Sequence, residues 1–143
     1  MEKDHFRKLE RMYYSAPINA FFKPTLKVEH GKTEISITVH PDFFHAASAV
    51  HGSVYFKALD DAAFFAVNSL VEDVFVLTAN FNLYFFQPIQ KGDLIAYGTV
   101  VYESKSSYMA EAVLYDPDGA QIARGSGSFI RSKIPLSEDI GYR

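Results

Sequence analysis

The most informative part of the sequence is residues 51–70, HGSVYFKALDDAAFFAVNSL. From residue 53 it contains no Gly or Pro and is rich in Ala and aromatic residues, which predicts one continuous helix with Ser53 as its N-cap. Ala58, Ala62 and Ala66 recur every four residues, so another element can pack very close to that side of the helix. Because few residues after the cap are polar, we expect the helix to be nearly enclosed by protein.

The polar residues of this helix fall into two groups. At about 100° per residue, Lys57, Asp61 and Asn68 lie on one narrow side, and Asp61 is interpreted as the partner of Lys57 on a solvated stripe. Asp60 is directed toward the apolar arc, and two interpretations of it stay open. Either it extends the solvated stripe, or it is a partly desolvated carboxylate whose raised pKa makes it a stronger base.

The segments on either side of the helix are predicted to be strands. Residues 25–39 alternate apolar and polar side chains around a turn at Gly31-Lys32, which predicts a hairpin. Four extended segments follow the helix, at residues 74–87, 93–104, 107–115 and 120–131. Their connections are short, so neighbouring strands are expected to be antiparallel. The predicted fold class is α+β, with an antiparallel sheet curled around one long helix.

The two ends of the chain are predicted to lie outside this domain. Residues 2–13 have apolar side chains at intervals of three and four among charges, which predicts a short surface helix that Pro17 terminates. We divide the chain into an N-terminal helix and lead-in (1–24), one domain (25–131) and a C-terminal tail (132–143). The sequence leaves open whether the first segment caps a pocket or only decorates the fold.

Composition excludes several classes of protein. The 143 residues are 48% apolar and 22% charged, which is typical of one globular domain and not of a disordered chain. A net charge of −3 without a basic patch argues against nucleic acid as a partner. There is no Cys, which excludes disulfides, thiolate zinc sites and cysteine nucleophiles. With no apolar signal or membrane-spanning stretch, we expect a cytoplasmic protein without a membrane partner.

Histidines near the helix start are the next candidates for chemistry. His40, His45 and His51 could be combined with Asp60 into a metal site, but spacings of five and six residues match no helical ligand motif, so we predict no metal. His51-Gly52 has another meaning, because the first N–H groups of a helix lack internal partners and lie at its positive end. Gly52 has no Cβ, so a substrate carbonyl could approach and be polarised there. The alternative is an ordinary loop turn.

The run from His51 to Ala62 resembles the HGG-x-x-x-x-x-x-D-x-A signature of hot-dog-fold acyl-CoA thioesterases, particularly the PaaI-like type of the phenylacetate pathway. Similar residues also stand at Asn68-Ser69, Val76-Leu77-Thr78-Ala79, Tyr84-Phe85-Phe86-Gln87-Pro88, Lys91-Gly92-Asp93 and Asp118-Gly119. The resemblance covers about residues 25–131. It implies the hot-dog fold, in which a curled sheet wraps a central helix.

The resemblance implies a role for each matching position. Asp60 falls on the family's catalytic carboxylate, which acts as general base on water or as nucleophile at the thioester carbonyl. Gly52 falls on the residue whose backbone N–H polarises that carbonyl, and Thr78 on a Ser or Thr that lies near the attacking water and often comes from the partner subunit. The family forms homodimers or dimers of dimers with active sites between protomers. Its substrate is an acyl-CoA, and we expect no cofactor beyond the coenzyme A of the substrate.

Two positions depart from the family pattern. Ser53 replaces the second Gly, which the start of a helix tolerates easily. His45 replaces an Asn or a similar polar residue. It could form an acid–base pair with Asp60, or it could be a loop histidine without a role in catalysis.

Aromatic residues make up 15% of the chain, which indicates a wide apolar surface or cavity. With the resemblance, several Phe side chains are expected to line a pocket for an aromatic or medium-chain acyl group: Phe43, Phe44, Phe64 and Phe65. Further substrate contacts are predicted from the helix start and from one cation at a strand end: His51, Ser53 and Arg131.

The leading hypothesis is a cytoplasmic acyl-CoA thioesterase in which Asp60, Gly52, Thr78 and His45 act in catalysis. The first alternative is a hot-dog hydratase or dehydratase that uses His45 with Asp60, although the His-Phe-Pro and Pro-Gly elements of those enzymes are missing. The second alternative is a non-catalytic acyl-CoA-binding protein.

Overall fold

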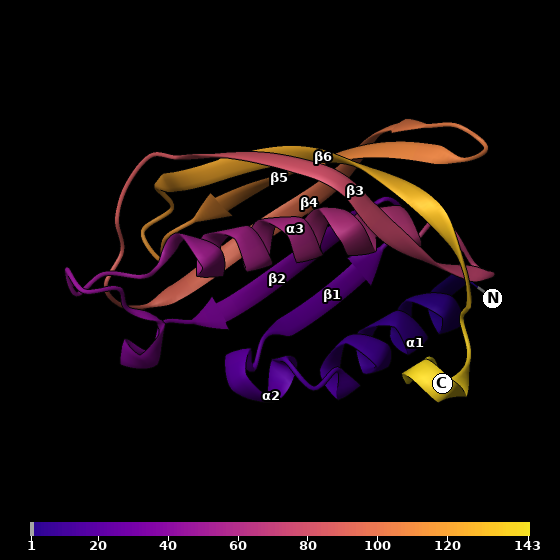
Figure 1. The fold of residues 1–143 in the computed structure, drawn as a ribbon, viewed down its shortest axis with the longest axis horizontal. Coiled ribbons are helices and arrows are strands. Elements are labelled where there is room, and N and C mark those ends of the chain that lie inside the picture. The colour runs from indigo at the N-terminus through magenta and orange to yellow at the C-terminus, as the bar shows by residue number, and fades with distance from the viewer. Residues whose placement is uncertain (1) are drawn as a thin grey trace.

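The stretch 51–70 forms α3 (Gly52–Asn68), and the other elements are arranged around it (Figure 1). The computed structural model describes residues 2–143. The helices that precede the sheet are α1 (Glu2–Ser15) and α2 (Asn19–Phe22). The strands are β1 (Thr25–Glu29), β2 (Lys32–Thr38), β3 (Val74–Phe85), β4 (Asp93–Glu103), β5 (Ser107–Tyr115) and β6 (Gln121–Pro135). Short 3-10 turns lie at Pro41–Phe43 and Glu138–Ile140.

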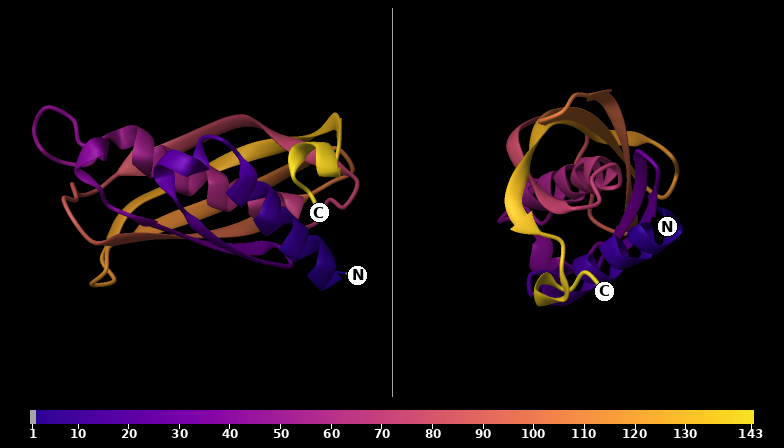
Figure 2. Two further views of the ribbon diagram at one scale, coloured as in Figure 1. Left: turned by 90° about the horizontal axis from the view of Figure 1, so that it is seen from below. Right: turned by 90° about the vertical axis from the view of Figure 1, so that its right-hand side faces the viewer.

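The six strands form one sheet in the order β1-β2-β4-β5-β6-β3, and every neighbouring pair is antiparallel. The sheet curls around α3, as the end-on view in Figure 2 shows. Helix and sheet come very close at Gly98 of β4, where an added Cβ would lie 2.2 Å from the carbonyl oxygen of Ala62. The predicted α+β architecture is therefore confirmed, and so is the close packing expected along the row of alanines.

The two edges of this sheet differ. Strand β1 is covered by α1: Arg7 and Glu10 bind the carbonyl and the amide of Val28, and Tyr14 binds those of Leu26. Strand β3 pairs only with β6 within residues 2–143, so its outer edge has backbone groups available for another strand. Large apolar side chains are exposed at the end of β3 and just beyond it: Tyr84, Phe85 and Phe86.

The start of α3 differs from the prediction in its cap. His51 is the N-cap, with φ −62° and ψ 144°, and its Nδ1 accepts a hydrogen bond from the amide of Ser53 at 3.0 Å. The prediction of Ser53 as N-cap is wrong, because the helix already begins at Gly52. The imidazole satisfies the amide that a Ser hydroxyl satisfies in most helices.

The end of α3 is fixed by one side chain. Asn68 is fully buried, and its Nδ2 donates to the carbonyls of Val71 and Val74 at 3.1 Å each, while its Oδ1 accepts from the amide of Val76 at 3.1 Å. The helix ends at Asn68, with Ser69 as its C-cap. These bonds also set the position at which β3 begins, so one residue links the helix to the strand beside it.

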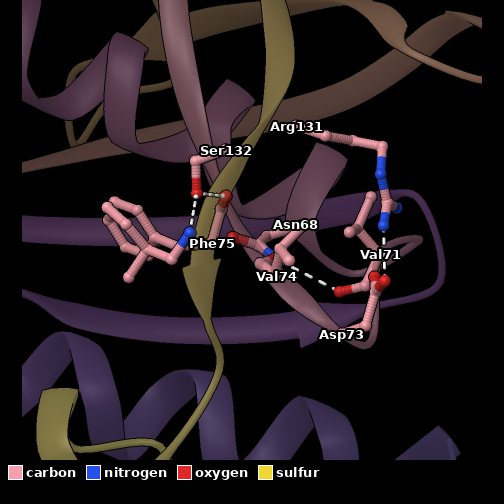
Figure 3. A network of polar contacts seen from close by, with 8 residues as sticks. Asn68, Val71, Asp73, Val74, Phe75, Arg131 and Ser132 are labelled. Carbon is pink, nitrogen blue, oxygen red and sulfur yellow. Dashed lines mark hydrogen bonds and ion pairs between the residues drawn. The ribbon is translucent and has the colours of Figure 1, made fainter.

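Strand β6 is longer than the predicted segment 120–131, because its last residues pair with the start of β3 up to Val74 and Pro135. Figure 3 shows two contacts that hold this extension in place: Arg131 binds Asp73, and the Ser132 hydroxyl donates to the carbonyl of Phe75. Beyond β6 the chain turns back toward α1 (Figure 1). The C-terminal segment thereby lies beside the N-terminal helix.

The helices of residues 2–143 also show whether any of them could cross a membrane. None of those in residues 2–143 combines the length and the apolar character that crossing a membrane requires.

Candidate active site

A cavity of about 780 Å³ lies against the middle of α3. Its walls come from α3, from the first half of β3 and from both ends of the chain. Four of the residues predicted for the site line it, namely Asp60, Phe64, Phe65 and Thr78. Most of the lining is apolar, and the charged side chains in it are Lys57, Asp60, Asp61, Glu138, Asp139 and Arg143. A largely apolar space of this size with a few polar groups is typical of a small-molecule site.

Asp60 is partly desolvated in this cavity. Burial is the main effect and raises the pKa of its carboxyl group to about 6; the negative charge of Asp61 also raises the pKa. The hydrogen bond from Thr78 and the positive charge of Lys57 lower the pKa and partly offset the rise. Of the two interpretations left open by the sequence, the geometry favours the desolvated carboxylate. Such a group is mostly ionised at neutral pH and binds a proton more readily than an exposed Asp, which suits a general base.

Thr78 follows the fully buried Val76 by two residues, so the alternation of β3 turns both side chains to the face that meets α3. The pairing of β3 with β6 shifts between Thr78 and Asn80, so Ala79 has no cross-strand partner. The Thr78 hydroxyl donates to Asp60 Oδ1 at 3.0 Å. The two side chains therefore meet within one chain, without any contribution from a second copy.

The pair of Lys57 and Asp61 is present but is not solvated. Lys57 Nζ lies 2.6 Å from Asp61 Oδ2, and the side chains are only 10% and 20% exposed. Tyr13 of α1 covers them: its hydroxyl donates to the same Asp61 oxygen at 2.6 Å, and Lys57 Nζ lies 5.2 Å from the centre of its ring. Burial, together with the charge of Asp61, raises the pKa of Tyr13. The predicted solvated stripe is wrong because α1 lies over it.

Gly52 and His45 lie in a second hollow, which they share with Tyr55 and Phe85. The amide N–H of Gly52 donates to no acceptor among residues 2–143, and an added Cβ would lie 3.1 Å from the Phe85 ring. His45 is exposed, and its Nδ1 accepts from the amide of Ala47 at 3.0 Å. Gly52 precedes Asp60 by eight residues of helix, a rise of about 12 Å, so one chain does not bring the two together.

The other predicted contacts are divided among different places. Phe65 lines the Asp60 cavity with Phe64, whereas a third hollow at the start of α3 gathers the remaining predicted residues of the loop and helix start: Phe43, Phe44, His51 and Ser53. Arg131 forms an ion pair with Asp73. That pair lies at the end of β6 and does not line any of these hollows.

The histidines are engaged individually. His40 caps the 3-10 turn after it, accepting from the amide of Asp42 at 3.2 Å, and His51 caps α3. Within the described residues, no three His, Asp or Glu side chains are placed to hold a metal ion.

Several residues that line the cavity were not indicated by the sequence. Met12 and Tyr13 come from α1, and Ile140 comes from the C-terminal turn. The helical spacing within residues 2–13 marks Met12 and Tyr13 as apolar-face residues but does not say what they cover. Nothing in the tail sequence signals Ile140.

A family model described as the thioesterase superfamily matches residues 47–123, more than half of the chain. The chain belongs to the thioesterase superfamily.

Relatives of this thioesterase-superfamily protein share its fold at low sequence identity. The Escherichia coli PaaI protein, from the phenylacetic acid degradation operon, superimposes with a TM-score of 0.86 at 16% identity, over 95% of this chain and 99% of its own. For a thioesterase from Haemophilus influenzae the TM-score is 0.77 at 11% identity, over 84% and 85% of the two chains. A protein of Saccharolobus solfataricus described as a candidate esterase is 24% identical over 112 residues, 78% of this chain and 75% of that protein.

These comparisons confirm the hot-dog fold and the PaaI-like resemblance that the sequence indicated. Membership in the thioesterase superfamily supports a thioester hydrolase activity.

Proposed function

We propose that this protein hydrolyses acyl-CoA thioesters. The observation that carries the proposal is the Asp60 carboxylate, which lies in a largely apolar cavity with its pKa raised to about 6. Thr78 binds its Oδ1, while its Oδ2 accepts no hydrogen bond within residues 2–143 and is available to a water molecule. Because a partly buried carboxylate destabilises a fold, its presence beside an open cavity favours a role in catalysis.

In this proposal Asp60 is the general base. It takes a proton from a water molecule as the water oxygen attacks the thioester carbonyl carbon. The oxyanion of the resulting tetrahedral intermediate accepts a hydrogen bond from the N–H of Gly52. The C–S bond then breaks, and Asp60 returns the proton to the departing thiolate of coenzyme A. Direct attack by Asp60, through an anhydride that water hydrolyses, is the alternative route to the same products.

This mechanism needs two copies of the chain, because Asp60 and Gly52 face different hollows. A homodimer with twofold symmetry would supply the amide of the partner's Gly52 to Asp60, and the reverse at a second site. The free outer edge of β3 and the exposed aromatic residues at its end support such a contact.

The order of contacts along β3 supports the same arrangement. Strand β3 runs antiparallel to α3, so Thr78 lies beside Asp60 while Phe85, later in the strand, lies against Gly52. Two β3 strands paired around an axis at Phe81–Asn82 would place Thr78 opposite the partner's Phe85. That register would bring the partner's Gly52 toward Asp60.

The acyl group would occupy the cavity beside Asp60. An aromatic cluster forms part of its wall: the ring of Phe64 lies 5.0 Å from that of Phe65 and 5.1 Å from that of Phe75, centre to centre. Such a wall suits an aromatic or medium-chain acyl group, which gains stability by removing apolar surface from water.

The test is thiol release from acyl-CoA substrates by Asp60→Asn protein. We expect a loss of about 10²–10⁴-fold in kcat with the fold retained, because the amide cannot accept the proton. Asp118→Asn is the matched control, since Asp118 is an exposed turn residue that does not line the cavity. Undiminished turnover by Asp60→Asn would remove the proposed role.

The same assay separates the alternatives. A hydratase or dehydratase would change the absorbance of an enoyl thioester without releasing thiol. Within the chain His45 lines a different hollow from Asp60, but it shares that hollow with Gly52, so the proposed dimer would also bring the partner's His45 toward Asp60. The measured reaction therefore decides between hydrolysis and this alternative. Tight binding of acyl-CoA without either reaction would indicate a binding protein.

A further inference from the structure

The cavity at Asp60 is closed on one side by the two ends of the chain. The residues that line it from the N-terminal end lie between Met12 and Asn19, and those from the C-terminal end lie between Ile134 and Arg143. Both segments fall outside residues 47–123, the part that matches the thioesterase superfamily. The superfamily region therefore supplies the carboxylate, whereas the ends of the chain supply a separate wall of the same space.

This wall is firmly anchored. His5 of α1 is only 2% exposed; its Nε2 donates to the carbonyl of Asn68 at 2.9 Å, and its Nδ1 accepts from the Tyr142 hydroxyl at 2.7 Å. Near the other end of α1, Gly141 packs so closely that an added Cβ would lie 2.2 Å from Ser15 Oγ. Figures 1 and 2 both show the C-terminal turn side by side with α1. The two ends are thus joined to each other and to the end of α3.

The wall also has a chemistry of its own. Met12, Ile18 and Ile140 contribute apolar side chains to the lining, and Ala16 contributes a small one. The C-terminal turn adds charged residues to the same wall: Glu138, Asp139 and Arg143. The apolar part of the wall makes no directional bonds, so it accepts or rejects an acyl chain by shape and by the apolar area that it covers. A change of side-chain volume at Ala16 or Ile140 changes the room available beside Asp60.

We propose that the two chain ends form the specificity-determining wall of the acyl site, where Ala16, Ile18 and Ile140 set the length of acyl group that fits beside Asp60. This inference rests on the proposed thioesterase function for the identity of the ligand. It assigns a role at the site to the part of the N-terminal segment between Met12 and Asn19, which caps the acyl pocket and does not merely decorate the fold.

The test measures binding apart from turnover. Non-hydrolysable S-alkyl thioethers of coenzyme A, from butyl to dodecyl, are titrated calorimetrically into the full-length protein and two variants. Ala16→Phe fills the cavity, so it should weaken binding of the longest chains by about tenfold or more and leave the shortest within about twofold. Ile140→Ala enlarges the cavity and should move the preference toward longer chains. Ala20→Phe, at an exposed position of α2 that does not line the cavity, is the matched control.

The outcomes distinguish this inference from the proposed function. If Ala16→Phe and Ile140→Ala shift the length preference in opposite directions while Ala20→Phe leaves it unchanged, the wall is established even if no thioester is hydrolysed. If wild-type protein releases thiol but both variants keep the wild-type length profile, the thioesterase function stands and the wall is refuted. Equal weakening at every chain length, or no binding of any thioether by wild-type protein, would also refute it. Melting temperatures of all variants establish that they are folded.

Discussion

Replacing Thr78 by Val tests how the site sets the proton affinity of Asp60. The Thr78 hydroxyl donates to the carboxylate at 3.0 Å, and this hydrogen bond lowers the pKa of Asp60 against the larger effect of burial. Val has nearly the shape of Thr but cannot donate. In the variant burial is therefore less opposed, and the pKa of Asp60 must rise further above about 6.

The size of the shift follows from the strength of that bond. A hydrogen bond to a charged group contributes about 1.5–3 kcal/mol, and partial solvent access to the cavity reduces this to about 1.4 kcal/mol, or about one pKa unit. The pKa of Asp60 should then move from about 6 to about 7. A general base works only when ionised, so at pH 7 the active fraction falls from about nine-tenths to about one half.

The assay is the pH dependence of kcat/KM for thiol release between about pH 4.5 and pH 9, which reports the pKa of the free enzyme's base. In wild-type protein activity should rise with pH through an inflection at about 6, and in Thr78→Val through one about a unit higher. Thr99→Val, on the outer face of β4, is the control and should leave the inflection in place. An inflection that stays at the wild-type pH in Thr78→Val, or moves to lower pH, would refute the reasoning.

The remaining predictions concern stability. Asp60→Asn should raise the free energy of unfolding at pH 8 by about 2–3 kcal/mol, because a carboxyl pKa raised from 3.8 to about 6 means that ionisation destabilises the folded state. Denaturant titrations should show the full gain above about pH 6. The gain should disappear below about pH 4, where Asp60 is protonated in both the folded and the unfolded state. A pH-independent difference would contradict this. Asn68→Ala should lower the free energy of unfolding by about 3 kcal/mol, since a fully buried side chain loses three hydrogen bonds. Thr99→Ala, at an exposed position of β4 away from the outer edge of β3, should change it by less than about 0.5 kcal/mol. Gly98→Ala should have the lowest melting temperature of these variants, because the added Cβ would meet the carbonyl of Ala62. A melting temperature equal to that of wild type would show that the helix can move away from β4.

Much of the fold follows from local patterns in the sequence. The run without Gly or Pro after Gly52 specifies a buried helix, and the alternation around Gly31 specifies a hairpin, because these periodicities act within a few residues. Asp60 stood out for the same reason, as a carboxylate directed toward the apolar arc of one helix. The boundaries were less predictable: Asn68 ends α3 through bonds to residues beyond the helix, and His51 caps it with an imidazole.

What the sequence missed depends on contacts between distant segments. Lys57 and Asp61 have the spacing of a surface pair, and only the position of α1 places Tyr13 over them. Ile140 enters the cavity because the chain after β6 turns back to α1, which no local pattern encodes. Gly52 and Asp60 share one helix and one motif, yet a rise of about 12 Å separates them, so their joint action requires geometry beyond a single chain.

The most direct test of the account is mixing of two inactive variants. Gly52→Pro removes the amide N–H at the first residue of α3, a position where helices tolerate Pro well. The preceding His51 has ψ of 144°, which is compatible with a following Pro. Gly52→Ala keeps the N–H and serves as the control. Each mixed dimer of Asp60→Asn and Gly52→Pro chains would contain one intact site. After exchange of subunits, activity should recover to about a quarter of wild type, because half of the dimers are mixed and each has one working site of two. No recovery, with mixed dimers demonstrated by mass spectrometry, would contradict a site shared between Asp60 of one copy and Gly52 of another.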